Sequence, residues 1–195
     1  MPDVKHFDRA DALASVQRLF WRQGVAATGI QDIVTATGLS RSSLYNAFGS
    51  KEELYVAALQ TYLDQRSRPM FERLASDDRG LPAISAFFDR LIRARCTGEH
   101  ARWGCLISNA HTERPGDAAR SLLDRHHDEL RSAFATALEV ASSKGQLRAG
   151  VDRAGTAELL TLLAYGVNLR SRSGASRADL TAGIHTALRG VSLAG

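Results

Sequence analysis

The stretch TGIQDIVTATGLSRSSLYNAFGSKEE, residues 28–53, predicts two short helices around a tight turn, with a further helix starting directly behind them. Ile30, Ile33 and Val34 recur at i, i+3 and i+4, so one side of the first helix is apolar and can be buried. Gly38 follows at the point where the helix must end, because glycine tolerates the positive φ of a helix C-terminus.

The second short helix presents a polar outer face. Ser40 is a good N-cap, since its hydroxyl can accept a hydrogen bond from a backbone N–H two or three residues later. Leu44 and Phe48 fall on its inner face. The outer face carries side chains that can all donate a hydrogen bond: Arg41, Ser42, Ser43, Tyr45 and Asn46. This arrangement is typical of a helix-turn-helix that reads the major groove of DNA.

The composition indicates a globular protein. With 195 residues and 44% hydrophobic residues, the chain can bury a substantial core as one domain or as a small and a medium domain. It has no apolar run of about 18 residues to cross a membrane, and its first residues lack the apolar core of a secretion signal, so we expect a cytoplasmic location. The two cysteines, Cys96 and Cys105, are too few for a disulfide framework and lack zinc-site spacing, which leaves thiol chemistry.

The net charge of +4 does not locate a DNA-binding region. Residues 1–63 contain six basic and six acidic residues, so the excess charge lies in residues 64–195, which hold 19 of the 25 basic and 15 of the 21 acidic residues. Only the local pattern is informative, because residues 33–51 include Arg41 and Lys51 and no acidic residue.

Helical periodicity and cap signals continue along the whole chain, and no segment has a convincing strand pattern. We therefore expect an all-α protein of about nine helices. Their approximate ranges are 8–23, 30–36, 41–47, 51–74, 82–97, 105–113, 117–143, 153–171 and 176–191. We find no internal repeat.

With these features the sequence resembles the TetR-type (TetR/AcrR) family of transcriptional regulators. The residues that carry the resemblance are Gly24, Thr28, Asp32, Ile33, Gly38, Leu39, Ser40, Leu44, Tyr45, Phe48, Ser50, Lys51 and Glu52. The resemblance implies a helix-turn-helix DNA-binding domain in residues 1–50 and an effector-binding and dimerisation domain in residues 51–195, with the helix at 51–74 as connector. It implies a homodimeric repressor that binds a palindromic operator in double-stranded DNA and is released by a small-molecule or thiol-reactive effector. It implies no cofactor, membrane association or enzymatic activity. The last two helices would form the dimer interface.

The same resemblance assigns the DNA contacts to Thr28, Gln31, Arg41, Ser42, Ser43, Tyr45, Asn46 and Lys51. Arg41 is suited to guanine and Gln31 to adenine, while Tyr45 and Lys51 match positions that bind phosphates. Gly29, Asn46 and Ala47 depart from the residues that the family often has at these positions, which leaves the operator sequence open.

The effector site is less defined. Candidate residues are Phe88, Trp103, Cys105, Asn109, Phe134, Tyr165 and Asn168, and the aromatic members are equally compatible with a plain hydrophobic core. Cys105 is either a small buried residue or a sensing thiol, since it begins a helix three residues after Arg102. The adjacent His126 and His127 point in different directions, so we interpret them as exposed polar residues rather than as metal ligands.

Two functional classes other than a regulator are compatible with a helical chain. A thiol-reactive protein without DNA function would depend on Cys105, and a helical adaptor would use the N-terminal helices to bind a protein. An enzyme is disfavoured, because the sequence has no nucleophile with a base, no paired carboxylates at a useful spacing and no phosphate-binding loop.

Overall fold

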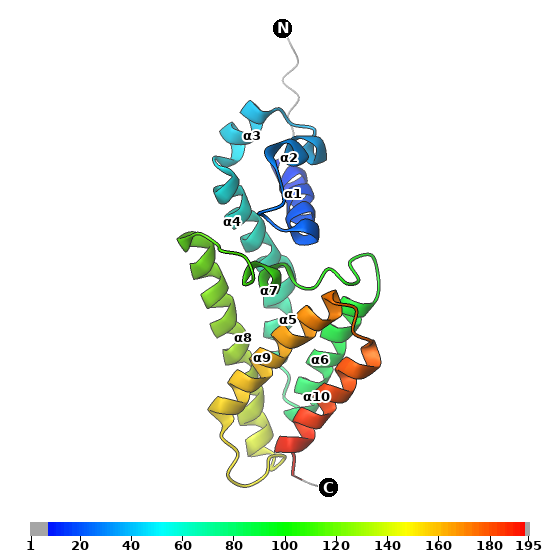
Figure 1. Ribbon diagram of the computed structural model, residues 1–195. Coiled ribbons are helices and arrows are strands. Elements are labelled where there is room, and N and C mark those ends of the chain that lie inside the picture. Colours follow the sequence, from blue (N-terminus) through cyan, green and yellow to red (C-terminus); the bar gives the residue numbers. More distant parts are fainter. Residues whose placement is uncertain (1–7, 194–195) are drawn as a thin grey trace.

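The helix-turn-helix forms where the sequence predicts it. The computed structural model describes residues 8–193, and its first helices pack together at one end of an elongated molecule (Figure 1). These helices are α1 (Arg9–Gln23), α2 (Ile30–Thr37) and α3 (Arg41–Phe48). Gly38 has a left-handed φ of 68° that lets the chain turn between α2 and α3, and the Ser40 hydroxyl accepts a hydrogen bond from the Ser43 N–H at 3.1 Å.

A single long rod leads from this end into the rest of the molecule. It consists of α4 (Lys51–Tyr62), the π-helical turn η1 (Leu63–Ser67) and α5 (Arg68–Ala75). A capping box between Ser50 and Glu53 starts the rod. Pro69 lacks a backbone N–H and its ring would clash with the carbonyl four residues earlier in a regular α-helix, so the π turn directly before it is the local solution to this proline.

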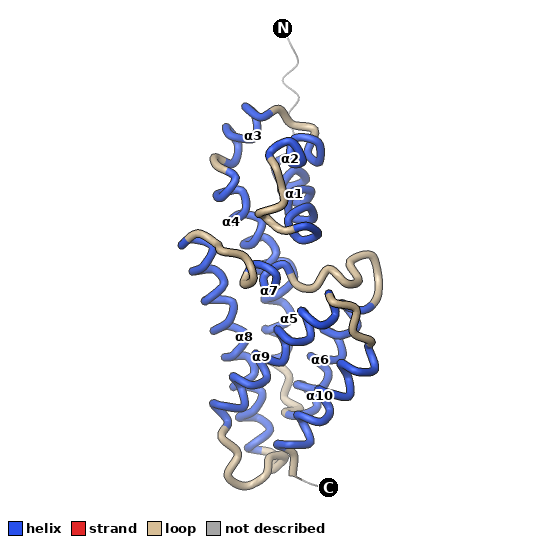
Figure 2. Tube along the Cα trace, viewed as in Figure 1, coloured by secondary structure: helices blue, strands red, loops and turns tan. Residues whose placement is uncertain are grey.

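The remaining helices form a bundle at the opposite end. They are α6 (Leu81–Cys96), the short α7 (Leu106–Ala110), α8 (Asp117–Ser143), α9 (Arg153–Arg172) and α10 (Arg177–Val191). With the rod counted as one helix, the predicted all-α fold is confirmed, and Figure 2 shows no strand among the described residues. Within residues 8–193, no helix is both long enough and apolar enough to cross a membrane.

The buried side chains form two hydrophobic clusters. One joins α1, α2 and α3 to the first half of the rod, to α7 and to the start of α8. The other fills the bundle of α5, α6, α8, α9 and α10. In the second cluster the rings of Phe87, Phe88 and Phe134 lie 5.0–5.6 Å apart. The first cluster extends across residue 50, so the helix-turn-helix is packed directly on the rest of the molecule.

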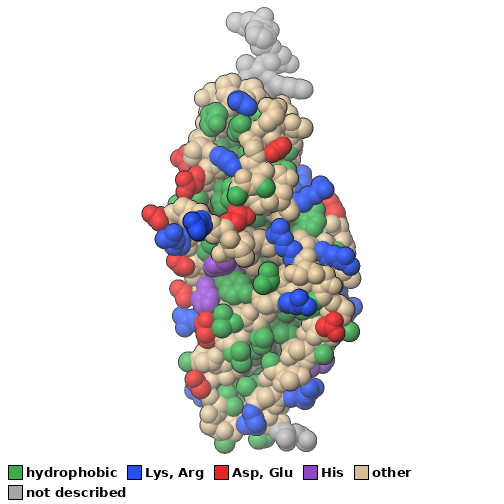
Figure 3. All heavy atoms as spheres, viewed as in Figure 1, with side chains coloured by type: hydrophobic (Ala, Val, Ile, Leu, Met, Phe, Trp, Pro, Cys, Tyr) green, Lys and Arg blue, Asp and Glu red, His purple; other side chains and the backbone are tan. Residues whose placement is uncertain are grey.

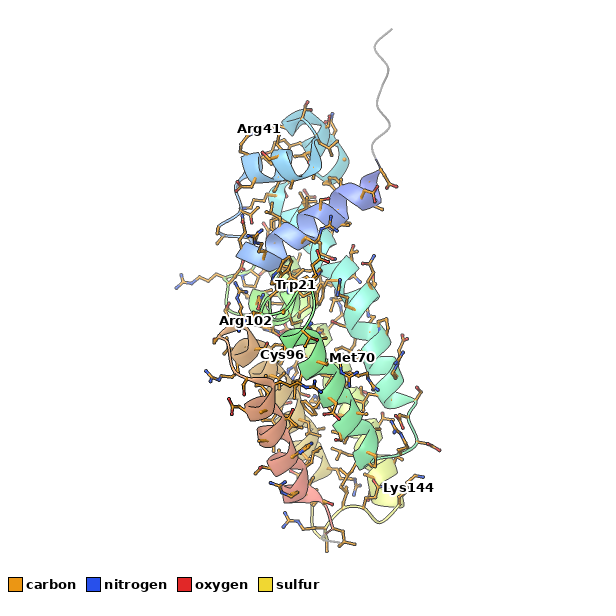
Figure 4. All side chains as sticks on the ribbon, turned by 90° about the vertical axis from the view of Figure 1, so that its right-hand side faces the viewer. Trp21, Arg41, Met70, Cys96, Arg102 and Lys144 are labelled. Atoms are coloured by element: carbon orange, nitrogen blue, oxygen red, sulfur yellow. The ribbon has the colours of Figure 1, made fainter. Side chains whose placement is uncertain are left out.

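The segment around α7 connects the two ends through hydrogen bonds as well as through packing. The Trp21 indole N–H donates to the Gly104 carbonyl at 3.1 Å, and the Val25 N–H donates to the Glu113 carboxylate at 3.1 Å. Asn109 steadies this segment, because its side-chain amide donates to the Trp103 carbonyl at 2.9 Å. Figures 1 and 4 show α7 and Trp21 at the junction between the helix-turn-helix and the bundle.

The expectation that His126 is an exposed polar residue is wrong. Its side chain is buried, packs on the Phe71 ring at 5.2 Å and has Nδ1 3.4 Å from the Tyr165 hydroxyl. Burial lowers the pKa of His126 to about 3, and the neighbouring His111, His127 and Arg68 contribute to this shift. The imidazole is therefore neutral at physiological pH.

The buried His126 predicts acid sensitivity. An unfolded histidine binds a proton below about pH 6.5, whereas folded His126 does not bind one until the pH approaches 3, so stability is lost as the pH falls below about 6.5. Between pH 6.5 and 5 this single group should remove about 2 kcal/mol of unfolding free energy. Urea titrations at pH 7.5 and 5 should show a smaller loss for His126→Gln than for the wild type. Equal losses in the two proteins would contradict the assignment.

Candidate nucleic-acid interface and effector site

The outer face of α3 is open to solvent at the tip of the molecule. Arg41, Ser42, Tyr45 and Asn46 are exposed, and Figure 4 shows Arg41 at the end farthest from the bundle. The Tyr45 side chain is 50% exposed, which is unusual for a large hydrophobic residue and leaves its hydroxyl accessible. This face combines one guanidinium with several neutral donors, the residue types that contact base edges and phosphates.

The two serines of α3 are held by its N-cap. The Ser40 hydroxyl lies 2.9 Å from both the Ser42 and the Ser43 hydroxyls, so the three form one local cluster at the start of the helix. Ser42 is exposed and Ser43 is half-buried. Gln31 is also exposed, on the preceding helix α2.

Lys51 is half-buried at the first turn of α4, beside free backbone N–H groups that favour an anion. Glu53 does not oppose this role directly, because it is occupied by the capping box: its carboxylate accepts a hydrogen bond from the Ser50 N–H at 2.7 Å. Hydrogen bonds from the Ser50 backbone and side chain lower the pKa of Glu53. The lysine and the start of α4 together have the chemistry of a phosphate contact.

Thr28 does not have the surface position that a phosphate contact requires. Its side chain is fully buried, and its hydroxyl donates to the Gly24 carbonyl at 2.6 Å while accepting from Gln23 Nε2 at 3.3 Å. These bonds fix the turn between α1 and α2. We therefore correct the expected role of Thr28 from a DNA contact to a structural one.

Three of the effector-site candidates meet in one place. Cys105, Tyr165 and Asn168 line a cavity of about 30 Å³ between the rod, α6, α8 and α9. Several other residues that line it were not predicted from the sequence, among them Tyr62, Arg66, Arg95 and His126. A cavity of this size accommodates a water molecule or two, whereas pockets for drug-sized ligands have volumes of about 300–1,000 Å³.

Arg95 is the most unusual residue of this cavity, because it is a charged side chain with only 8% of its surface exposed. Its Nε donates to the Asn168 side-chain oxygen at 2.6 Å and its Nη2 donates to the Tyr62 hydroxyl at 3.2 Å. Both partners are neutral, and burial raises the pKa of Tyr62 above its usual range. The Cys105 side chain lines the same cavity as Tyr62 and Arg95.

The basic neighbour of Cys105 is therefore not the one expected from the sequence. Arg102 is exposed, and it has a left-handed φ of 64° in the loop before α7. The sequence does contain a signal for Arg95, since it continues the i, i+3, i+4 stripe of Phe88, Leu91 and Ile92 on the buried face of α6.

The loop that leads into Cys105 is tightly constrained. Gly104 has a φ of 69°, and a Cβ at this position would lie 2.8 Å from the Asn109 side-chain oxygen and 3.2 Å from the Asn168 carbonyl. Glycine is therefore required here for both its conformation and its size. The same residue supplies the carbonyl that binds Trp21, so the constraint reaches from Cys105 to α1.

The other four effector-site candidates predicted from the sequence lie outside the small cavity. Asn109 and Tyr165 also line a pocket of about 630 Å³ between the α1–α2 turn, α7 and α9. Phe88 and Phe134 lie in the bundle core with rings 5.6 Å apart, and they do not border either space. Trp103 packs on Trp21 at 5.4 Å and on His100 at 4.7 Å, at the junction of the two ends.

In comparisons with known proteins, both the helix-turn-helix and the bundle match models of one protein family. Residues 13–58 match the family model described as bacterial regulatory proteins, tetR family, and residues 80–186 match the tetracyclin repressor-like, C-terminal domain. The HTH-type transcriptional repressor ComR of Escherichia coli is 31% identical over 188 residues, which cover 95% of this chain and 89% of ComR. The uncharacterized HTH-type transcriptional regulator YezE of Bacillus subtilis is 29% identical, over 73% of this chain and 74% of that protein.

Solved structures give the same result. A cysteine mutant of the TetR family transcriptional regulator CifR, in complex with 26 bp operator DNA, superposes with a TM-score of 0.85 and 26% identity, covering 97% of this chain and 99% of that one. The reduced form of E. coli NemR shares the fold, with a TM-score of 0.77, 21% identity and coverage of 96% and 98%. These relatives are regulators rather than enzymes. The chain belongs to the TetR family of DNA-binding transcriptional regulators.

Proposed function

We propose that the protein is a homodimeric repressor that binds a palindromic operator and is released by an effector. The observation that carries this proposal is the exposed α3 face, with Arg41, Ser42, Tyr45 and Asn46, on the helix-turn-helix of a TetR-family chain. A relative of nearly equal length bears the name of a transcriptional repressor, and another binds operator DNA. The division into a DNA-binding domain at residues 1–50 and an effector domain at 51–195 is part of the proposal.

An apolar face on α9 supports dimerisation. Leu159, Leu162 and Leu169 are 47–56% exposed, and their spacing puts them on one side of the helix. Figure 3 shows hydrophobic side chains gathered over α9 and α10 on the face toward the viewer. Exposed leucines grouped in this way mark an interaction surface, and a two-fold pairing of these two helices would bury them in a four-helix bundle. A dimer also presents two α3 helices to the two halves of a palindrome.

Two spaces offer places for an effector. The pocket of about 630 Å³ suits a small molecule, and it borders both the turn after α1 and the bundle. The cavity of about 30 Å³ suits only a small chemical change on Cys105. Binding of a small molecule or modification of Cys105 would act near α7 and the rod and would alter the separation of the two α3 helices. A preference of a few kcal/mol for the conformation that does not fit the operator is enough to release the DNA.

The first test is binding to DNA from the promoter region of the protein's own gene. Fluorescence anisotropy should show specific binding that weakens steeply as salt increases, because phosphate contacts release counterions. Specific binding would also separate the proposal from the two alternatives, a helical adaptor and a thiol-reactive protein without DNA function. Absence of any specific, salt-sensitive binding would overturn the repressor proposal.

Arg41 and Lys51 should have different roles on the operator. We expect Arg41→Ala to reduce discrimination at one base pair by about 1–3 kcal/mol, because a bidentate contact to a base edge is lost. Lys51→Ala is the matched variant, and it should weaken all sequences alike and reduce the salt slope by about one. Anisotropy titrations on the operator and on single-base variants check both effects. Identical profiles for the two variants would show that the roles are wrongly assigned.

The leucine face of α9 should determine the oligomeric state. Leu162→Glu places a charge in the proposed interface and should weaken dimerisation by at least about tenfold, or ~1.4 kcal/mol. The 54% exposure of Leu162 means that the monomer itself should stay folded. Sedimentation equilibrium checks this result, with Thr136→Glu in the groove between α5 and α8 as the control. A dimer that is equally stable in both variants would place the interface elsewhere.

A further inference from the structure

The buried Arg95 lacks a negative partner. Among the described residues, it forms no ion pair with a carboxylate, and its two hydrogen-bond acceptors are the neutral Tyr62 and Asn168. A buried charge is costly unless an anion compensates it. The fold nevertheless places this guanidinium at the wall of a cavity, so the site has an unused capacity to stabilise negative charge.

Cys105 is the group in this cavity that can acquire that charge. It is 3% exposed and lines the same cavity as Arg95 and Tyr62. Cys96, the second cysteine, is half-buried at the end of α6 and does not line this cavity. The volume of about 30 Å³ leaves room for one or two added atoms and excludes a bulky adduct.

We propose that Cys105 is an oxidation site for small hydroperoxides, and that Arg95 and Tyr62 bind the oxygen that the reaction adds. In this step the thiol sulfur attacks one peroxide oxygen, an S–O bond forms and the O–O bond breaks. The sulfur is oxidised to a sulfenic acid, and the other peroxide oxygen leaves with the thiol proton, as water from hydrogen peroxide or as an alcohol from an alkyl hydroperoxide. The Arg95 guanidinium and the Tyr62 hydroxyl then hydrogen-bond the new oxygen, in its acid or its sulfenate form, inside the cavity.

The inference rests on the proposed function, because it names the effector class of a regulator. It also gives a physical route to the DNA-binding end. Cys105 is the N-cap residue of α7, and the preceding residue, Gly104, supplies the carbonyl that holds the Trp21 indole. An oxygen drawn toward Arg95 shifts the start of α7, and with it the contacts that position α1.

The two cysteines provide an internal comparison. Trypsin cleaves after Arg95, Arg102 and Arg120 but not at the Arg114–Pro115 bond, so Cys96 and Cys105 fall in separate peptides, residues 96–102 and 103–120. The full-length protein is treated with hydrogen peroxide, the excess is removed with catalase, and the protein is then unfolded in urea with dimedone, which traps sulfenic acids and gives adducts that mass spectrometry quantifies. A parallel sample receives N-ethylmaleimide, a bulky thiol reagent.

We expect Cys105 to be the faster cysteine with peroxide and the slower one with N-ethylmaleimide. Arg95→Met should slow peroxide oxidation of Cys105 by at least about tenfold, because a hydrogen bond to a charged group is lost, and should leave Cys96 unchanged. Arg95→Lys keeps the charge and should retain more of the rate, while Tyr62→Phe should have a smaller effect than Arg95→Met. Circular dichroism checks that each variant is folded.

The proposal is overturned if Cys96 reacts with peroxide as fast as Cys105, if both reagents give the same ratio of the two cysteines, or if the folded Arg95→Met protein oxidises at the wild-type rate. Operator binding is measured separately. A wild-type protein that never binds DNA would refute the proposed function and leave the oxidation chemistry intact. Peroxide release of DNA from wild type but not from Cys105→Ser would support both.

Discussion

The hydrogen bond from the Trp21 indole to the Gly104 carbonyl is the contact on which the arrangement of the molecule depends. Trp21 is 1% exposed and lies in the last turn of α1, so the orientation of the helix-turn-helix follows from where this side chain is held. The Arg66 guanidinium lies 5.0 Å over the same ring from the π turn of the rod, and the ring of Tyr62 packs against it at 5.0 Å. Trp21, from the DNA-binding end, thus contacts Arg66 and Tyr62, two residues that also line the small cavity.

The rod and the segment around α7 therefore form two separate connections between the helix-turn-helix and the bundle. The rod is continuous along the backbone, but it contains a π turn at Leu63–Ser67, where regular helical hydrogen bonding is interrupted before Pro69. α7 has a single turn and depends on neighbours at both ends, Gly104 with Trp21 and Glu113 with Val25. Short elements held by few contacts open more easily than long packed helices, so α7 is the weaker of the two connections between the bundle and the helix-turn-helix.

Much of the fold could be predicted from the sequence because its helices carry strong local signals. The range 117–143 matches α8 to the residue, and Gly38 and Ser40 mark the turn between α2 and α3. The exposed position of Tyr45 also follows from periodicity, since Leu44 takes the inward place. Thr28 and His126 are buried against expectation, because their residue types favour the surface and only tertiary packing encloses them.

The small cavity beside Cys105 could not be predicted from the sequence in the same way. Its residues come from the rod, α6, the start of α7, α8 and α9, and no local pattern states which faces of these helices meet. Periodicity puts Arg95 on the apolar side of α6, but a charged residue in a run of arginines is normally interpreted as solvated. The dimer interface remains a prediction, because the structure of a single chain shows the exposed apolar face of α9 but not the surface that would cover it.

The most direct test of the link between the ends is amide hydrogen exchange at Val25, measured by NMR on the reduced and the peroxide-treated protein without DNA. The Val25 N–H is protected by the Glu113 carboxylate just after α7, whereas the Gly38 N–H is bonded within its own domain to the Val34 carbonyl. If α7 transmits the state of Cys105, oxidation should speed exchange at Val25 by at least about tenfold and leave Gly38 unchanged. Release of operator DNA by peroxide with unaltered exchange at Val25 would contradict the account.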